Sequence, residues 1–328
     1  MSGRTLLLVV FYVLLYVLVL RWAFQKPTHP FPDDEKYIRA TLKKLLIARH
    51  VGSPGHAAVR DFLDKELMRL GFLSKSYDFF EGINYSNVVG YWNDQADQYL
   101  VLTSHYDGPS PRKEQEKDVL VSATDGAVSC AILLALARTF RLFARSLGPS
   151  TGLVLVFFDG HESQATEPEK KPKLYGSQHF VNSQIIPKDE IALVVSLNHI
   201  GAPNQTFPSF SEKNHKNHNR IANIERELRK SGKLVDSHVL FHKIVSYKND
   251  LPDDHVPFKE YGVPVLHIAP PKYPDVHHTA ADKAENLHWP TILNMIKILR
   301  HFIFDFLVSI DTDEYESDFY GYINGEYV

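Results

Sequence analysis

Three short stretches of this 328-residue sequence carry Asp, Glu and His side chains of the kinds that bind metal ions. The segment TGLVLVFFDGHE ends in His161 and Glu162, SATDGA contains Asp125, and VHHTAAD contains His278. Zinc in proteins takes carboxylate and imidazole ligands, and a catalytic zinc keeps one position open. The spacing alone leaves two interpretations open, a zinc site or a set of unrelated helix caps and surface groups.

Apolar runs precede these residues and predict the elements that position them. Residues 153–158, LVLVFF, have no polar break, which is typical of a strand covered on both faces in a parallel sheet. Strands are predicted at 72–80, 83–92, 99–105, 153–158, 191–197 and 263–268, and helices at 35–50, 55–70, 125–142, 176–182, 217–231 and 289–307. This alternation predicts an α/β fold, a three-layer sandwich with helices on both faces of a mainly parallel sheet. Antiparallel pairing is expected near residues 72–105.

The predicted sheet gives the candidate residues a common location. Ligands of open α/β sheets bind beyond the carboxyl ends of the strands. His161 and Glu162 follow a central strand directly, so we expect the site at this edge.

Composition excludes some classes of function. The formal net charge of −3 gives no sign of nucleic-acid binding. The only cysteine, Cys130, cannot form an intramolecular disulfide and is expected to be a small buried apolar residue.

The N-terminus predicts a membrane anchor. Residues 6–20 are an unbroken apolar run with Arg4 before it and Arg21 after it, and no good cleavage site follows. We expect a retained signal-anchor with the body in the lumen of the Golgi or the ER, since a short span suits thin membranes. A cleaved signal peptide and a secreted product are the alternative. The sequons at Asn84 and Asn204 are compatible with a luminal glycoprotein.

The remaining organisation follows from composition. We expect an anchor over residues 1–25, a Pro-rich linker over 26–34, one domain over 35–308 and an acidic tail over 309–328.

Several motifs resemble those of the glutaminyl-peptide cyclotransferases, or glutaminyl cyclases. They are SHYD, SATDGAVSCAILLALAR, LVFFDGHE, LYGSQHF, IGAPNQTFP, PDDHVPF, YGVPVLHI and YPDVHHTAADKAENL, in order from about residue 35 to 308. The resemblance implies the α/β fold of the zinc aminopeptidases, one zinc ion per chain, and conversion of N-terminal Gln, slowly also Glu, of peptides and proteins to pyroglutamate. The N-terminal anchor is similar to that of the Golgi-resident branch.

The resemblance also implies roles for individual residues. The zinc ligands fall on Asp125, Glu162 and His278, and Asp253 falls on an acid of the network beside the substrate. His105 matches a residue that binds the second metal in the aminopeptidases, and His255 matches the histidine of the DDH motif. Substrate-binding positions fall on Asn198, His277 and Tyr273.

This sequence departs from the family pattern around the metal. His161 stands where the family has the Glu that acts as general base and acid, and Asn198 where it has the partner acid. His277 stands where the family has Trp. The family disulfide would join Cys130 to position 104, which is Ser104 here.

These departures leave three functions open. The first is a glutaminyl cyclase in which His161 moves the proton, because the reference pKa of imidazole lies near neutrality. A nearby zinc dication should lower the pKa of His161. The second is a zinc-binding homologue with weak activity or none. The third, a zinc aminopeptidase, is disfavoured because Asn198 replaces the Asp that binds the second metal.

Overall fold

The computed structural model describes residues 34–110, 119–142, 144, 147–162, 173–210, 215–242 and 250–311. The chain divides into two units, Met1–Pro32 and Asp33–Val328, and the described residues belong to the second. The predicted anchor, most of the linker, the charged loop after residue 110, the loop after Glu162 and most of the acidic tail lie outside the described residues.

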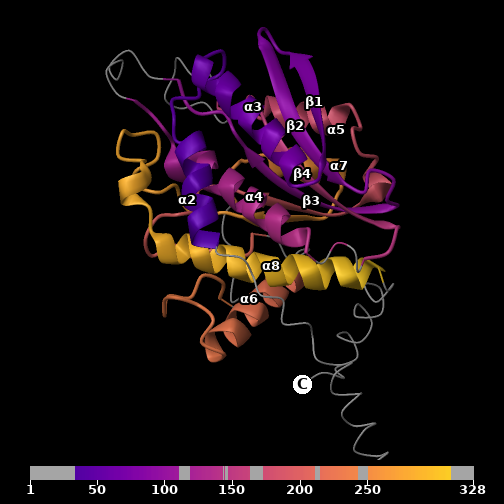
Figure 1. Cartoon of the computed structure of the whole chain (residues 1–328), viewed down its shortest axis with the longest axis vertical. Coiled ribbons are helices and arrows are strands. Elements are labelled where there is room, and N and C mark those ends of the chain that lie inside the picture. Colours follow the sequence, from indigo (N-terminus) through magenta and orange to yellow (C-terminus); the bar gives the residue numbers. More distant parts are fainter. Residues whose placement is uncertain are drawn as a thin grey trace, which may run out of the picture. The chain divides into compact units, whose positions relative to one another are not determined.

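A six-stranded mixed sheet forms the centre of the described part (Figure 1). Its spatial order is β1-β2-β4-β3-β5-β6. The strands are β1 (Leu73–Phe80), β2 (Asn84–Trp92), β3 (Gln98–His105), β4 (Thr151–Phe158), β5 (Ile191–Leu197) and β6 (Val265–Ile268). All six predicted strands are present.

The strand directions confirm a mainly parallel sheet and correct one detail. β4, β3, β5 and β6 run parallel to one another, whereas β1 and β2 pair antiparallel and β2 pairs antiparallel with β4. Antiparallel pairing was expected as far as residue 105, but β3 is parallel to both its neighbours. The local sequence cannot show this, because β3 pairs only with strands that come later in the chain.

Strand β4 is buried at every position, and its side chains alternate between two apolar cores. Leu153, Leu155 and Phe157 belong to the larger core, and Val154 and Val156 to the smaller. This two-sided burial explains why residues 153–158 include no polar residue.

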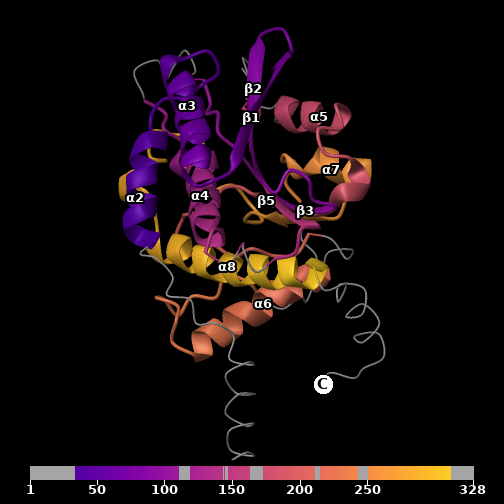
Figure 2. The same cartoon turned by 45° about the vertical axis from the view of Figure 1, so that its right-hand side comes forward.

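Helices cover both faces of the sheet (Figures 1 and 2). The helices are α2 (Asp34–Leu45), α3 (Pro54–Arg69), α4 (Val128–Phe140), α5 (Tyr175–Asn182), α6 (His215–Lys230), α7 (His255–Tyr261) and α8 (Trp289–Asp311). Residues of α2, α3, α4, α6 and α8 build the larger core, and residues of α5 and α7 build the smaller one. The fold is therefore the predicted three-layer sandwich, although α7 was not predicted.

Two local features follow from the sequence. The side chain of Ser53 caps α3 by accepting a hydrogen bond from the backbone N–H of His56, and serine is a preferred residue at this position. Among the described residues, the one stretch long and apolar enough to span a membrane is Ala123–Phe140, and 94% of it is buried inside the fold. It is thus the core helix α4 and the turn before it, and it does not bear on the predicted anchor.

Candidate metal centre and catalytic residues

The three predicted ligands meet beyond the carboxyl ends of the parallel strands. Nε2 of His278 lies 3.2 Å from Oδ2 of Asp125 and 3.1 Å from Oε1 of Glu162. Asp125 lies in the turn before α4, Glu162 follows β4, and His278 lies in the loop after β6. Three loops far apart in sequence therefore place two carboxylates around one imidazole nitrogen.

Two of the separations among these ligand atoms fit a metal centre. Asp125 is fully buried, and its Oδ2 has no hydrogen-bond partner. Zinc–ligand bonds of about 2.0–2.1 Å place the ligand atoms of a tetrahedral centre about 3.3–3.4 Å from one another. The two separations at His278 are close to this value. The donor set suits zinc and is one ligand short of four.

The charges at this point favour a cation. Burial alone would lower the pKa of His278, but its contacts with Asp125 and Glu162 outweigh burial and raise that pKa to about 10. Burial, followed by the negative charge of Asp125, raises the pKa of Glu162. Both shifts show that the cluster attracts positive charge, which a bound metal ion would supply in place of a proton.

The turn that carries Asp125 is irregular. We predicted that a helix begins at Asp125, but α4 begins at Val128 and Asp125 has non-helical angles (φ −94°, ψ 87°). Gly126 has φ +87°, and a Cβ atom there would lie 2.8 Å from the backbone oxygen of His105. Only glycine fits this position. Asp282 fixes the turn by accepting a hydrogen bond from the backbone N–H of Thr124 (2.8 Å).

Two supporting residues were not predicted from the sequence. Arg49 is buried and donates hydrogen bonds to the backbone oxygens of Tyr106, Ser122 and Asp125, at 2.8, 3.0 and 2.9 Å. No local pattern distinguishes this arginine from a surface residue of the predicted helix. Asp107 accepts hydrogen bonds from the backbone N–H groups of His161 (3.3 Å) and Glu162 (2.8 Å). Its position in the motif SHYD, at the end of a predicted buried strand, is the sequence feature that could have indicated this role.

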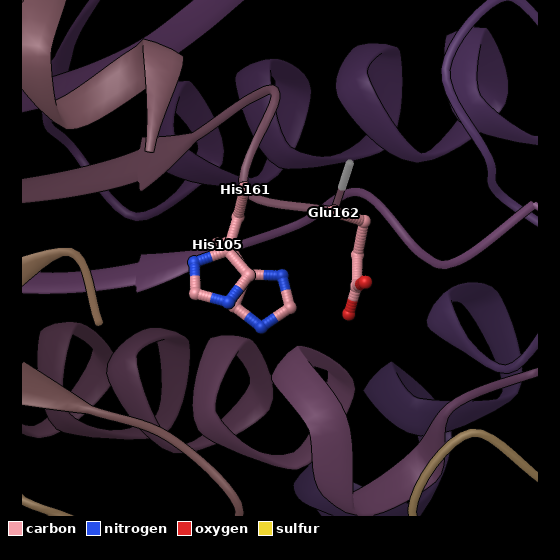
Figure 3. Close-up of side chains that lie close together, drawn as sticks. All are labelled: His105, His161 and Glu162. Carbon is pink, nitrogen blue, oxygen red and sulfur yellow. The ribbon is translucent and has the colours of Figure 1, made fainter. Parts of the chain in front are cut away.

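His161 lies flat against His105 (Figure 3). The ring centroids are 3.9 Å apart, and the ring planes differ by 11°. Nδ1 of His161 lies 2.9 Å from Oδ2 of Asp254, and Ser177 donates a hydrogen bond to the other oxygen of Asp254 (2.6 Å). The ring is held in one orientation by stacking on one side and by a carboxylate at its edge.

The residues around His161 raise its pKa, whereas the sequence led us to expect that a nearby zinc ion would lower it. Burial and the neighbouring His105 lower the pKa of His161, but Asp254 and Asp253 outweigh them and raise it to about 9. A bound dication acts in the opposite direction. The expectation of a lowered pKa left out the two aspartates, because nothing in the sequence places them beside residue 161.

Asp253 connects His161 to a second pair of histidines. One oxygen of Asp253 lies 3.7 Å from Nδ1 of His161, and the other lies 3.1 Å from Nε2 of His267. Asp250 joins His267 (2.7 Å) to His255 (2.8 Å), the histidine of the DDH motif. The structure therefore places Asp253 between His161 and His267. His267 and Asp250 were not predicted from the sequence.

Asn198 lies on the opposite side of His105 from Asp107. Its Oδ1 atom is 3.3 Å from Nε2 of His105 and accepts a hydrogen bond from the backbone N–H of His199 (2.8 Å). Its Nδ2 atom is buried without a hydrogen-bond partner.

The next residue, His199, is also buried. Burial lowers the pKa of His199 to about 3, so this imidazole is neutral.

Aromatic side chains form one wall of the site. Tyr273 is 37% exposed and stacks on His277 with a centroid distance of 4.3 Å and an interplanar angle of 5°. His199 meets Tyr273 edge-on at 5.0 Å. The wall is therefore built from Tyr and His side chains.

Cys130 is buried and unpaired, as expected from the sequence. Its Sγ atom lies 3.8 Å from Oγ of Ser104. The two positions that the family disulfide would join are therefore neighbours.

Comparisons with known proteins identify the class of protein that this fold and site define. Residues 87–303 match the model of peptidase family M28. A leucine aminopeptidase precursor from Bacteroides thetaiotaomicron has the same fold, with a TM-score of 0.67 at 17% identity over 84% of this chain and 97% of that one.

Closer relatives narrow the class. The chain is 35% identical to the glutaminyl-peptide cyclotransferase of Bos taurus over 295 residues, 81% of this chain and 80% of the relative. It is 31% identical to that of Drosophila melanogaster over 296 residues, 84% and 82% of the two chains. The structure of Macrostomum lignano glutaminyl cyclase matches with a TM-score of 0.75 at 28% identity, over 84% of this chain and 90% of that one. This chain belongs to the glutaminyl-peptide cyclotransferase family.

Proposed function

We propose that this protein converts N-terminal Gln of peptides and proteins to pyroglutamate with release of ammonia, and acts more slowly on N-terminal Glu. One observation carries the proposal. In a chain of this family, His278 Nε2 lies 3.2 and 3.1 Å from carboxylate oxygens of Asp125 and Glu162, which is the spacing of metal ligands. These three side chains would hold one zinc ion, which when bound polarises the side-chain carbonyl of the substrate.

His161 is the group that moves the proton. Cyclisation joins the α-amino nitrogen to the side-chain amide carbon, breaks the bond from that carbon to the amide nitrogen, and transfers one proton from the amine to the departing ammonia. Because Nδ1 of His161 faces the Asp254 carboxylate, the neutral ring keeps its proton there and leaves Nε2 free to accept one. Residue 161 adjoins Glu162, and one ligand atom of each lies within 4.8 Å of the other.

The remaining residues position the substrate. Tyr273, whose ring stacks on His277, is partly exposed and suits contact with a small side chain, and Asn198 offers a buried, unpaired Nδ2 group. Asp253, whose pKa is held well below its usual range by His267 and His161 despite burial, stays ionised and suits a cationic α-amino group.

Metal analysis tests the zinc site. Purified protein should contain about one zinc per chain, and His278→Ala should remove it, because the variant loses one of three ligands. His288→Ala is the matched control, since His288 lies directly before α8 and is hydrogen-bonded to Thr291. Two zinc ions per chain, or none, would contradict the proposal.

The pH dependence tests the pairing of His161 with Asp254. The active base is neutral His161, so the rate should rise with pH through its pKa. Asp254→Asn removes a carboxylate that raises this pKa, so the acid limb of the pH–rate profile should move to lower pH. Asp250→Asn is the control, because Asp250 contacts His255 and His267. An acid limb that stays in place, or moves to higher pH, would exclude this role of Asp254.

We also propose that residues 6–20 are a retained signal-anchor and that the body lies in the lumen of the Golgi or the ER. The apolar run supports this, and the side chains of both sequon asparagines, Asn84 and Asn204, are exposed. Glycosidase treatment should shift the mobility of the full chain, and Asn84→Gln with Asn204→Gln should abolish the shift. The protein should stay with membranes in alkaline carbonate. A soluble secreted product that begins near Lys26 would refute the anchor.

A further inference from the structure

A second histidine points at the same carboxylate oxygen as His278. Nδ1 of His277 lies 3.4 Å from Oδ2 of Asp125. Both atoms are buried, and neither has a hydrogen-bond partner. Buried polar atoms are nearly always paired, so two unpaired atoms that face each other call for a shared partner.

The geometry fits a metal ion as that partner. A hydrogen bond from N–H to oxygen has a usual length of about 2.9–3.0 Å, so 3.4 Å is long for one. Neighbouring ligand atoms of a tetrahedral zinc are about 3.3–3.4 Å apart. One ligand atom each from Asp125, His277 and His278 lies within 4.8 Å of the other two.

The surroundings keep His277 in this place. Its ring is stacked between Tyr273, at a centroid distance of 4.3 Å, and His278, at 3.8 Å. Its side chain is 20% exposed. The next residue, His278, has φ +54°, a left-handed conformation that is strained for a residue with a Cβ atom. Such strain clusters at functional sites, and here it lets two adjacent imidazoles face one oxygen.

We propose that His277 Nδ1 is a fourth protein ligand of the zinc ion, in addition to Asp125, Glu162 and His278. This inference rests on the proposed function, because it assumes the zinc site. In the substrate-free protein, the position that a catalytic zinc usually leaves open is then capped by a side chain. With zinc bound, a substrate carbonyl would have to displace this imidazole, so His277 would set how readily the site accepts a substrate.

Ligand counting on the zinc-loaded protein tests the proposal. X-ray absorption at the zinc edge should show two imidazole ligands in the wild type and one in His277→Phe, which keeps a flat ring between Tyr273 and His278. In competition with a chromophoric chelator, His277→Phe should bind zinc about 10–100-fold more weakly, at least the loss that follows removal of an outer-shell partner. Tyr273→Phe, which keeps the stacking ring, should bind zinc like the wild type.

The outcomes separate this inference from the proposed function. If the wild type binds no zinc, or His278→Phe binds it as well as the wild type, the zinc site itself is wrong. If the wild type binds zinc through a single imidazole, or His277→Phe and His277→Ala bind zinc as tightly as the wild type, His277 lines the site but does not bind the metal. The wild-type spectrum decides this even where a variant fails to fold.

Discussion

His161→Ala is expected to lower kcat/KM for a peptide with N-terminal Gln by about 10²–10⁴-fold, the usual contribution of a general acid–base. The ring of His161 is fixed by His105 and Asp254, and residue 161 adjoins the proposed zinc ligand Glu162. The zinc content should stay the same, because His161 is not one of the proposed ligands. The loss should therefore fall mainly on kcat.

His161→Phe is the matched variant for this test. It keeps a ring against His105 and removes both nitrogens, so it should be as inactive as His161→Ala. If either variant turns over as fast as the wild type while zinc is retained, His161 does not move the proton.

His161→Glu combined with Asn198→Asp is expected to raise activity, by up to about 10²-fold. The pair restores the carboxylates that the family pattern has at these positions. A carboxylate at 198 would face Nε2 of His105, where the Asn198 oxygen now lies at 3.3 Å, and would replace the unpaired Nδ2 group. Two carboxylates can share a proton, which Asn198 cannot accept.

The single variants serve as controls for the double one. Each changes half of the pair, and because the two positions share His105 as a neighbour, their effects should not add. If the double variant gains nothing while the wild type is active, the His161 arrangement is already a complete proton shuttle. If the wild type is inactive and the double variant is active, the chain kept its metal site and lost its base.

The sequence predicted the part of the fold that depends on local pattern. The unbroken run at residues 153–158 predicted a strand buried on both faces, and β4 supplies residues to both cores. Strand ends in a parallel sheet meet at one edge, which predicted where the site lies. The resemblance assigned Asp125, Glu162 and His278 as ligands, and the structure brings these three together.

The rest depends on contacts between distant segments. Arg49 holds the turn of Asp125 from 76 residues away, and nothing in its neighbourhood in the sequence marks it. Asp254 lies 93 residues from His161, so the sequence does not show that this carboxylate raises the pKa of His161 against the effect of a metal ion. The resemblance assigned His277 to substrate binding, and nothing in the sequence shows that its Nδ1 faces Asp125.

The most direct test is to incubate the purified body of the protein, loaded with zinc, with a peptide that begins with Gln and to follow the peptide mass. The account predicts loss of one ammonia per peptide, no change for a peptide whose N-terminus is acetylated, and no reaction with His278→Ala. Release of the N-terminal residue, or an unchanged Gln peptide at full zinc occupancy, would contradict it.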